Sequence, residues 1–157
     1  MLHRQATNAE IASLTQSLPV ANQTEALQIQ ILKGSEYRGQ FSSTSSYVTA
    51  VYEVLTRQAP SSATLQSWIN RLETGLSTSQ FVMSVASSNA GRIGQIDRAY
   101  ADFLMRAPSQ LELNHWFSRY RQTNPQDRTI ALSLMNSNEF RQQQRTANLL
   151  PVSTQSK

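Results

Sequence analysis

The side chains that could perform catalysis are few and lie far apart along this chain of 157 residues. It has two histidines, His3 near the N-terminus and His115 inside a predicted helix. A lone histidine on a helix is far more often a surface or packing residue than a general base. No serine lies in the strand–turn–helix context of a nucleophile elbow. The sequence therefore predicts no catalytic residues, and we expect a protein that is not an enzyme.

Metal and cofactor ligands are equally sparse. The ten carboxylates occur singly and match neither a calcium loop nor a metal-binding motif. The absence of cysteine excludes thiolate metal sites and disulfides. No glycine-rich loop could hold a phosphate group. We therefore expect no metal site and no cofactor.

Positive charge is the remaining chemical feature, and almost all of it is arginine. Residues 1–90 hold five basic and five acidic side chains, whereas residues 91–157 hold nine and five, which gives the whole net charge of +4. An excess this small is most commonly a solvated surface, but an uneven distribution also favours an acidic partner. The candidate interaction face consists of five arginines of the second half: Arg119, Arg121, Arg128, Arg141 and Arg145.

The elements that position these arginines come from an internal repeat. The stretch "YEVLTRQAPSSATLQSW" (residues 52–68) is followed by "YADFLMRAPSQLELNHW" (residues 100–116), in phase at an offset of 48. The offset becomes 49 further on, where Ser88-Asn89 matches Ser137-Asn138. A partial copy at an offset of 54 matches Leu27 with Phe81. Such a period is typical of a helical repeat protein.

Each full unit is predicted to contain three helices, because apolar residues recur at helical spacing and no long stretch alternates with period two. We expect an all-α fold of tandem three-helix repeats packed into one helical domain. The predicted parts are a two-helix partial repeat, two full repeats, and a C-terminal helix extension ending near Leu150: 1–41, 42–90, 91–140 and 141–157. Three sequences have capping-box form: Thr7-x-x-Glu10, Asn22-x-x-Glu25 and Ser77-x-x-Gln80.

The repeated phrase itself is predicted to be a scaffold. Proline cannot continue a helix, so the first helix of each unit must end near it, and Ser61, Ser62 or Ser109 is available to cap the second. Each tryptophan then lies two turns into the second helix, where it can pack on the tyrosine of the first, and we expect both tryptophans to be equally buried. Arg71 and Arg119 are expected to pair with helix-end carbonyls or with the glutamates that close the units, Glu36 and Glu139. The repeat-core and turn residues are Tyr52, Pro60, Trp68, Tyr100, Arg106, Pro108 and Trp116.

These phrases, each followed by "FVMSVASSNA" or "IALSLMNSNEF", resemble the bacterial "domain of unknown function 4214" family over roughly residues 7–140. "LQIQILKGSEYRGQF" is similar to the related phycobilisome linker-polypeptide domains. The aspartate that the family has after proline is replaced by Ser61 and Ser109. The resemblance implies helical modules of large bacterial surface, matrix or assembly proteins, without catalytic activity.

The sequence thus predicts a non-enzymatic structural or interaction module that mediates protein–protein assembly, with a linker-like or matrix-like role. The partner is another protein with an acidic surface or a second copy of the chain; a polysaccharide-attachment module and a nucleic-acid-binding module remain alternatives. The apolar residues of the N-terminal partial repeat, such as Ile11 and Leu14, are expected to pack on the next repeat or on another chain. No apolar run approaches the roughly 20 residues of a membrane span, and both a cell-surface and a large cytoplasmic assembly remain open.

Overall fold

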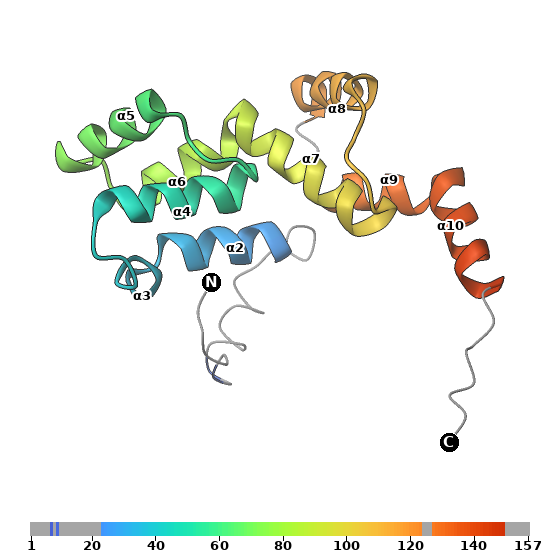
Figure 1. Cartoon of the computed structure of the whole chain (residues 1–157), viewed down its shortest axis with the longest axis horizontal. Helices are drawn as coiled ribbons and strands as arrows, with labels where there is room; N and C mark the ends of the chain where they lie inside the picture. Colours follow the sequence, from blue (N-terminus) through green and yellow to red (C-terminus); the bar gives the residue numbers. More distant parts are fainter. Residues whose placement is uncertain (1–6, 8, 10–22, 124–126, 150–157) are drawn as a thin grey trace. The chain divides into compact units, whose positions relative to one another are not determined.

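The computed structural model describes residues 7, 9, 23–123 and 127–149, and no strand occurs among them. The all-α prediction is confirmed. The described helices, labelled in Figure 1, are α2 (Gln23–Lys33), α3 (Ser35–Arg38), α4 (Thr44–Thr56), α5 (Ser62–Glu73), α6 (Thr78–Ser87), α7 (Asn89–Leu104), α8 (Gln110–Thr123), α9 (Asp127–Met135) and α10 (Asn138–Leu149).

Both proline turns separate two helices where the sequence predicted. Pro60 lies between the end of α4 and the start of α5, and Pro108 lies between α7 and α8. Ser61 is the N-cap of α5, and its hydroxyl accepts a hydrogen bond from the backbone N–H of Thr64. The capping box of α6, formed by Ser77 and Gln80, is confirmed. The other two predicted boxes, at Thr7 and Asn22, involve residues outside the described part of the chain.

The chain divides into two compact units, residues 1–95 and 96–157, and the division falls within α7. In the first unit, α4 lies between α2 and α5 (Figure 1). The predicted repeat boundaries, which follow residues 41, 90 and 140, remain a prediction.

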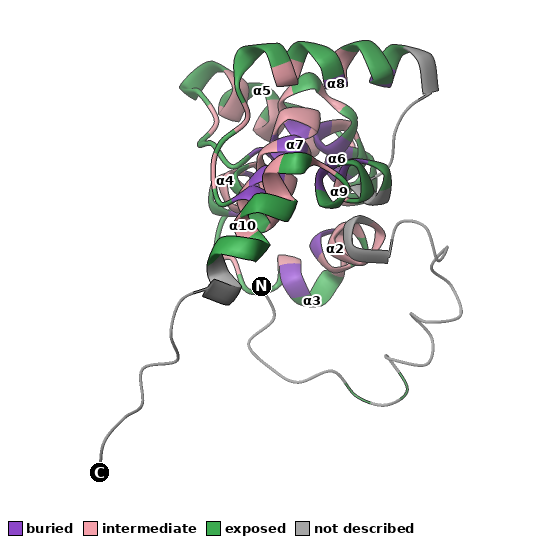
Figure 2. Cartoon of the chain, turned by 90° about the vertical axis from the view of Figure 1, so that its right-hand side faces the viewer, coloured by how far each residue is buried: buried purple, intermediate pink, exposed green. Residues whose placement is uncertain are grey.

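The core of the first unit lies between α2, α4 and α6, as the buried residues in Figure 2 show. Tyr47 is at its centre: its ring meets the rings of Tyr37, Phe41 and Phe81 edge to face, at centroid distances between 5.8 and 6.3 Å. Its hydroxyl donates a hydrogen bond to the carbonyl of Leu32. Burial raises the pKa of Tyr47 to about 12. α5 lies against this core from outside and contributes no fully buried residue.

The core of the second unit is smaller and is built around α7, α8 and α9. It consists of seven buried side chains: Ile96, Tyr100, Leu104, Trp116, Tyr120, Ile130 and Leu134. The indole N–H of Trp116 donates a hydrogen bond to the hydroxyl of Tyr100 at 3.2 Å. The predicted tyrosine–tryptophan contact is therefore present in this unit.

The expectation that the two tryptophans are equally buried is wrong. Trp116 is 2% exposed, whereas Trp68 is only partly buried. The reason is the different position of the second helix in each unit. Trp116 and Tyr120 of α8 are buried in the core of the second unit, whereas α5 packs on the outside of the first core and has no buried residue. The ring that Trp68 contacts is that of Phe81, edge to face at 5.1 Å.

Glycine permits an unusually close backbone approach where α7 begins. A Cβ atom built on Gly94 would overlap the carbonyl oxygen of Leu55 and lie 2.8 Å from the Cα atom of Thr56, at the end of α4. The start of α7 therefore packs backbone to backbone against α4. The predicted repeat aligns Gly94 with Gln143 of the second unit, at an offset of 49. The side chain of Gln143 donates a hydrogen bond to the carbonyl of Leu104, at the end of α7.

Several geometric features recur at the spacing of the predicted repeat. Arg57 and Met105, 48 positions apart, have the left-handed backbone, with φ of 59° and 52°. Ser88 and Ser137, 49 positions apart, accept hydrogen bonds from the backbone N–H groups of Gly91 and Phe140, both at 3.1 Å. The alignment of the two full copies remains a prediction.

Candidate interaction surfaces

The most elaborate polar arrangement in the described structure is centred on Arg106, which follows α7. Its guanidinium group binds two carboxylates at once. Nη1 and Nη2 donate to Glu112 at 2.9 and 2.7 Å, while Nε and Nη2 donate to Glu139 at 2.6 and 2.7 Å. The guanidinium carbon also lies 5.1 Å from the centroid of the Tyr100 ring. Arg106 therefore joins the starts of α8 and α10 to the end of α7.

Glu112 has a second role in this arrangement, which we call the Arg106 cluster (Tyr100, Arg106, Ser109, Glu112 and Glu139). It accepts hydrogen bonds from the backbone N–H and the hydroxyl of Ser109, both at 2.7 Å, and so caps α8. No role for Glu112 was predicted from the sequence. The signal was present: Ser109-x-x-Glu112 has the form of a capping box.

The electrostatics of the Arg106 cluster favour its charged form. Hydrogen bonds from Arg106 lower the pKa of Glu112 to about 2, and burial opposes this shift. The same guanidinium lowers the pKa of Glu139, and the two glutamates raise the pKa of Arg106. The three side chains are 30 to 39% exposed, so solvent screens their attraction considerably.

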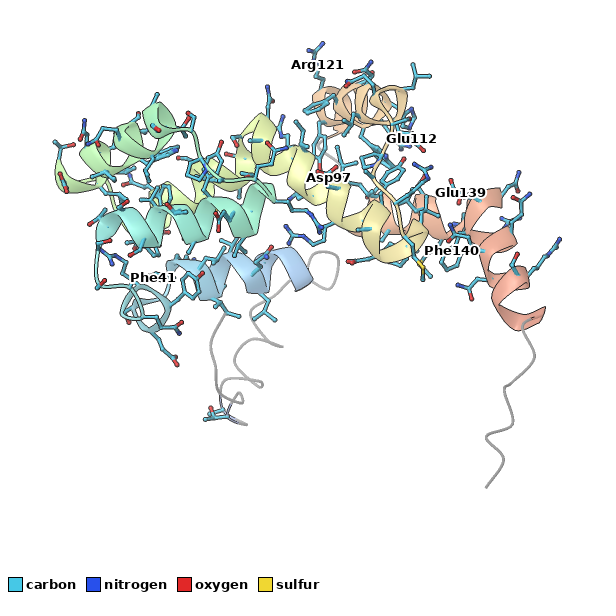
Figure 3. The ribbon with its side chains drawn as sticks, in the orientation of Figure 1. Phe41, Asp97, Glu112, Arg121, Glu139 and Phe140 are labelled. Carbon is cyan, nitrogen blue, oxygen red and sulfur yellow. The ribbon has the colours of Figure 1, made fainter. Side chains whose placement is uncertain are left out.

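The predicted interaction face is distributed over two helices. Arg119 and Arg121 lie in the second half of α8, and Arg141 and Arg145 lie on α10; all four are exposed. Figure 3 shows Arg121 at the end of α8 opposite Glu112. Arg141 donates a hydrogen bond to the carbonyl of Asn136. The side chain of Arg128, the fifth predicted member, lies outside the described residues.

Arginines that cover aromatic rings form a second surface feature. The guanidinium carbon of Arg71 lies 4.4 Å from the ring centroid of Trp68, and that of Arg119 lies 5.7 Å from Trp116. Arg71 was predicted to pair with helix-end carbonyls or with the closing glutamates, and neither pairing occurs among the described residues. The final carbonyls of α5 are used locally: Thr74 and Leu76 donate their backbone N–H groups to the carbonyls of Asn70 and Arg71.

The remaining candidates for chemistry do not converge into a site. His115 is exposed on α8, with its ring 5.4 Å from that of Trp116, and His3 lies outside the described residues. Among the described residues, no group of three or more histidine, cysteine, aspartate or glutamate side chains could hold a metal ion. In that same part of the chain, no helix has the length and apolar character needed to cross a membrane.

Comparison with known proteins gives no relative from which a role could be transferred. No family model, no curated protein and no solved structure matches the chain.

Proposed function

We propose that the protein is a non-enzymatic interaction module that binds an acidic surface of a partner protein through α8 and α10. The observation that carries this proposal is the use of the glutamates on these helices. Glu112 is the one acidic residue of α8 and Glu139 is the one acidic residue of α10, and both are bound to Arg106. Beyond these two glutamates, α8 and α10 carry the exposed arginines Arg121, Arg141 and Arg145 and no second acidic residue.

The charge arrangement explains why the partner should be acidic. Arg106 holds the starts of both helices, so the arginines beyond it are carried on fixed backbones. We name Arg119, Arg121, Arg141 and Arg145 the basic face. Guanidinium groups bind carboxylates through paired N–H donors. Dissolved salt screens the attraction between exposed charges, with a screening length of about 8–10 Å at ordinary salt concentration. Binding should therefore weaken as the ionic strength rises.

Two further points support assembly with a protein. The resemblance to linker-polypeptide domains implies a module that joins other chains. The predicted tandem repeat implies helical units that bury surface against neighbours. The family membership and the linker role are parts of this proposal, as is the absence of catalysis.

The test removes two charges from the basic face in the variant Arg121→Gln/Arg145→Gln. A matched control, Lys33→Gln/Arg57→Gln, removes two charges from the first unit. Both proteins and the wild type are immobilised and exposed to extract of the source organism at about 0.01 M and about 0.15 M salt, and the bound molecules are identified by mass spectrometry and nucleic-acid staining.

We expect one acidic protein to be retained by the wild type and the control, more strongly at low salt, and to be lost with the basic-face variant. Equal retention by both variants would contradict the proposal. Retention of nucleic acid or polysaccharide in place of a protein would replace it with one of those alternatives. An enzymatic activity abolished by His115→Ala would contradict the non-enzymatic part.

A further inference from the structure

The aromatic-backed arginines of this chain differ in what their N–H groups bind. Arg106, over Tyr100, donates to the carboxylates of Glu112 and Glu139. Arg38 lies 4.8 Å from the centroid of Tyr47 and donates to the hydroxyl of Thr44 at 3.2 Å. In both cases the ring covers one face of the guanidinium, and its edge is used by acceptors from the same chain.

Arg71 also stacks on an aromatic ring, but its guanidinium donates no hydrogen bond to an acceptor among the described residues. Its guanidinium carbon is the closest of these to its ring, 4.4 Å from the Trp68 centroid, and the residue is exposed. Within the described part of the chain, no side-chain or backbone oxygen accepts a hydrogen bond from its guanidinium group. The nearby carbonyl of Asn70 accepts from the hydroxyl of Thr74 at 2.9 Å as well as from its N–H.

The stacking prepares Arg71 for a planar anionic ligand. Contact with the indole restricts the rotamers of a long side chain, so less conformational entropy is lost when a ligand binds. The ring occupies a face of the guanidinium, and the N–H donors lie in the plane at its edge. A carboxylate matches this edge with two parallel hydrogen bonds.

We propose that Arg71 and Trp68 form a binding site for a carboxylate of an acidic segment from a partner protein. The Arg106 cluster shows the same chemistry completed within the chain, with glutamate as the acceptor. This site goes beyond the basic face, because it lies on α5 of the first unit, whose sequence up to residue 90 has no net charge. Local geometry, rather than an excess of charge, distinguishes it.

The experiment uses the two tryptophans of the chain as reporters. The wild-type protein labelled with ¹⁵N is titrated with a synthetic glutamate-rich peptide, and the indole N–H signals are followed by NMR. Trp68→Phe assigns the signals. Arg71→Gln tests the site, and Arg57→Gln, which removes an exposed charge from the same unit, is the matched control.

We expect the Trp68 signal to shift on titration, with an affinity about fivefold weaker in Arg71→Gln, the size expected for one exposed ion pair. Arg57→Gln and the basic-face variant Arg121→Gln/Arg145→Gln should both retain the Trp68 shift, which separates this site from the basic face. A Trp68 signal that does not move, or that moves equally in Arg71→Gln, would overturn the proposal. A stronger response to an oligonucleotide or to dextran sulfate than to the peptide would also overturn it.

Discussion

Two turns of the molecule share a backbone geometry but are stabilised by different contacts. They are the turn between α4 and α5 and the turn between α7 and α8. Each has a non-glycine residue in the left-handed conformation, Arg57 or Met105, followed by a proline three positions later and a serine that caps the next helix. The first turn is then held locally, because the buried hydroxyl of Thr56 donates to the carbonyl of Gln58. The second is held by Arg106, which reaches a glutamate 33 residues away.

This difference extends to the packing of the two units. The first unit has the larger core and joins α7 to α4 through the close backbone approach at Gly94. The second has the smaller core and uses polar contacts from Arg106 and Gln143. A helix–turn–helix geometry can therefore be kept while its stabilisation changes from a local neutral hydrogen bond and close backbone packing to charge-assisted hydrogen bonds.

The largest predicted effect tests the unequal tryptophans. Trp116→Ala should lower the free energy of unfolding by about 4 kcal/mol, because it opens a cavity in the core and leaves the Tyr100 hydroxyl without its donor. Trp68→Ala should cost only about 2 kcal/mol, since Trp68 is half-buried. Urea unfolding followed by circular dichroism measures both values. Trp116→Phe is the control that keeps most of the volume, and equal losses at the two positions would contradict the comparison.

An intermediate effect is predicted at the helix junctions. Gly94→Ala should destabilise the first unit by about 1–3 kcal/mol, because the new methyl group would overlap the backbone of α4. This is opposite in sign to the gain that alanine normally gives inside a helix. Gln143→Ala should cost about 1 kcal/mol through one lost hydrogen bond. Thermal unfolding reports both changes, and a more stable Gly94→Ala protein would refute the close approach.

The smallest predicted effect is a pH-dependent loss of stability in the second turn. Arg106→Gln places in the second turn the residue type that the first turn has at Gln58. The substitution should lower the free energy of unfolding by about 1 kcal/mol at neutral pH, after allowance for solvent screening. Because the pKa of Glu112 in the folded state is depressed to about 2, its contribution is complete above the ordinary value near 4.5 and is lost as the pH falls towards 2.

The difference between wild type and Arg106→Gln should therefore shrink over that acidic range, as measured by urea midpoints at a series of pH values. Asp102→Asn, which removes an exposed carboxylate of α7, is the charge control. A difference that persists unchanged at pH 2 would mean that Arg106 acts through packing.

Local rules of the sequence were enough to predict the helices but not the contacts that distinguish the units. Pro60 and Pro108 forced the two turns, and Ser77 with Gln80 predicted a capping box that the structure contains. The contact between Arg106 and Glu139 spans 33 positions, and no spacing rule connects residues so distant. The difference between Trp68 and Trp116 depends on how deeply each helix packs, which the matching apolar patterns of α5 and α8 do not encode.

The position of α5 has a consequence for how the first unit fluctuates. A segment that contributes no fully buried residue can separate from the core at a smaller free-energy cost than the helices that form it. Its amide hydrogens should then exchange with solvent through openings that leave α4 and α6 intact. α8, anchored by Trp116, Tyr120 and the carboxylate of Glu112, would open only when its own core is disrupted.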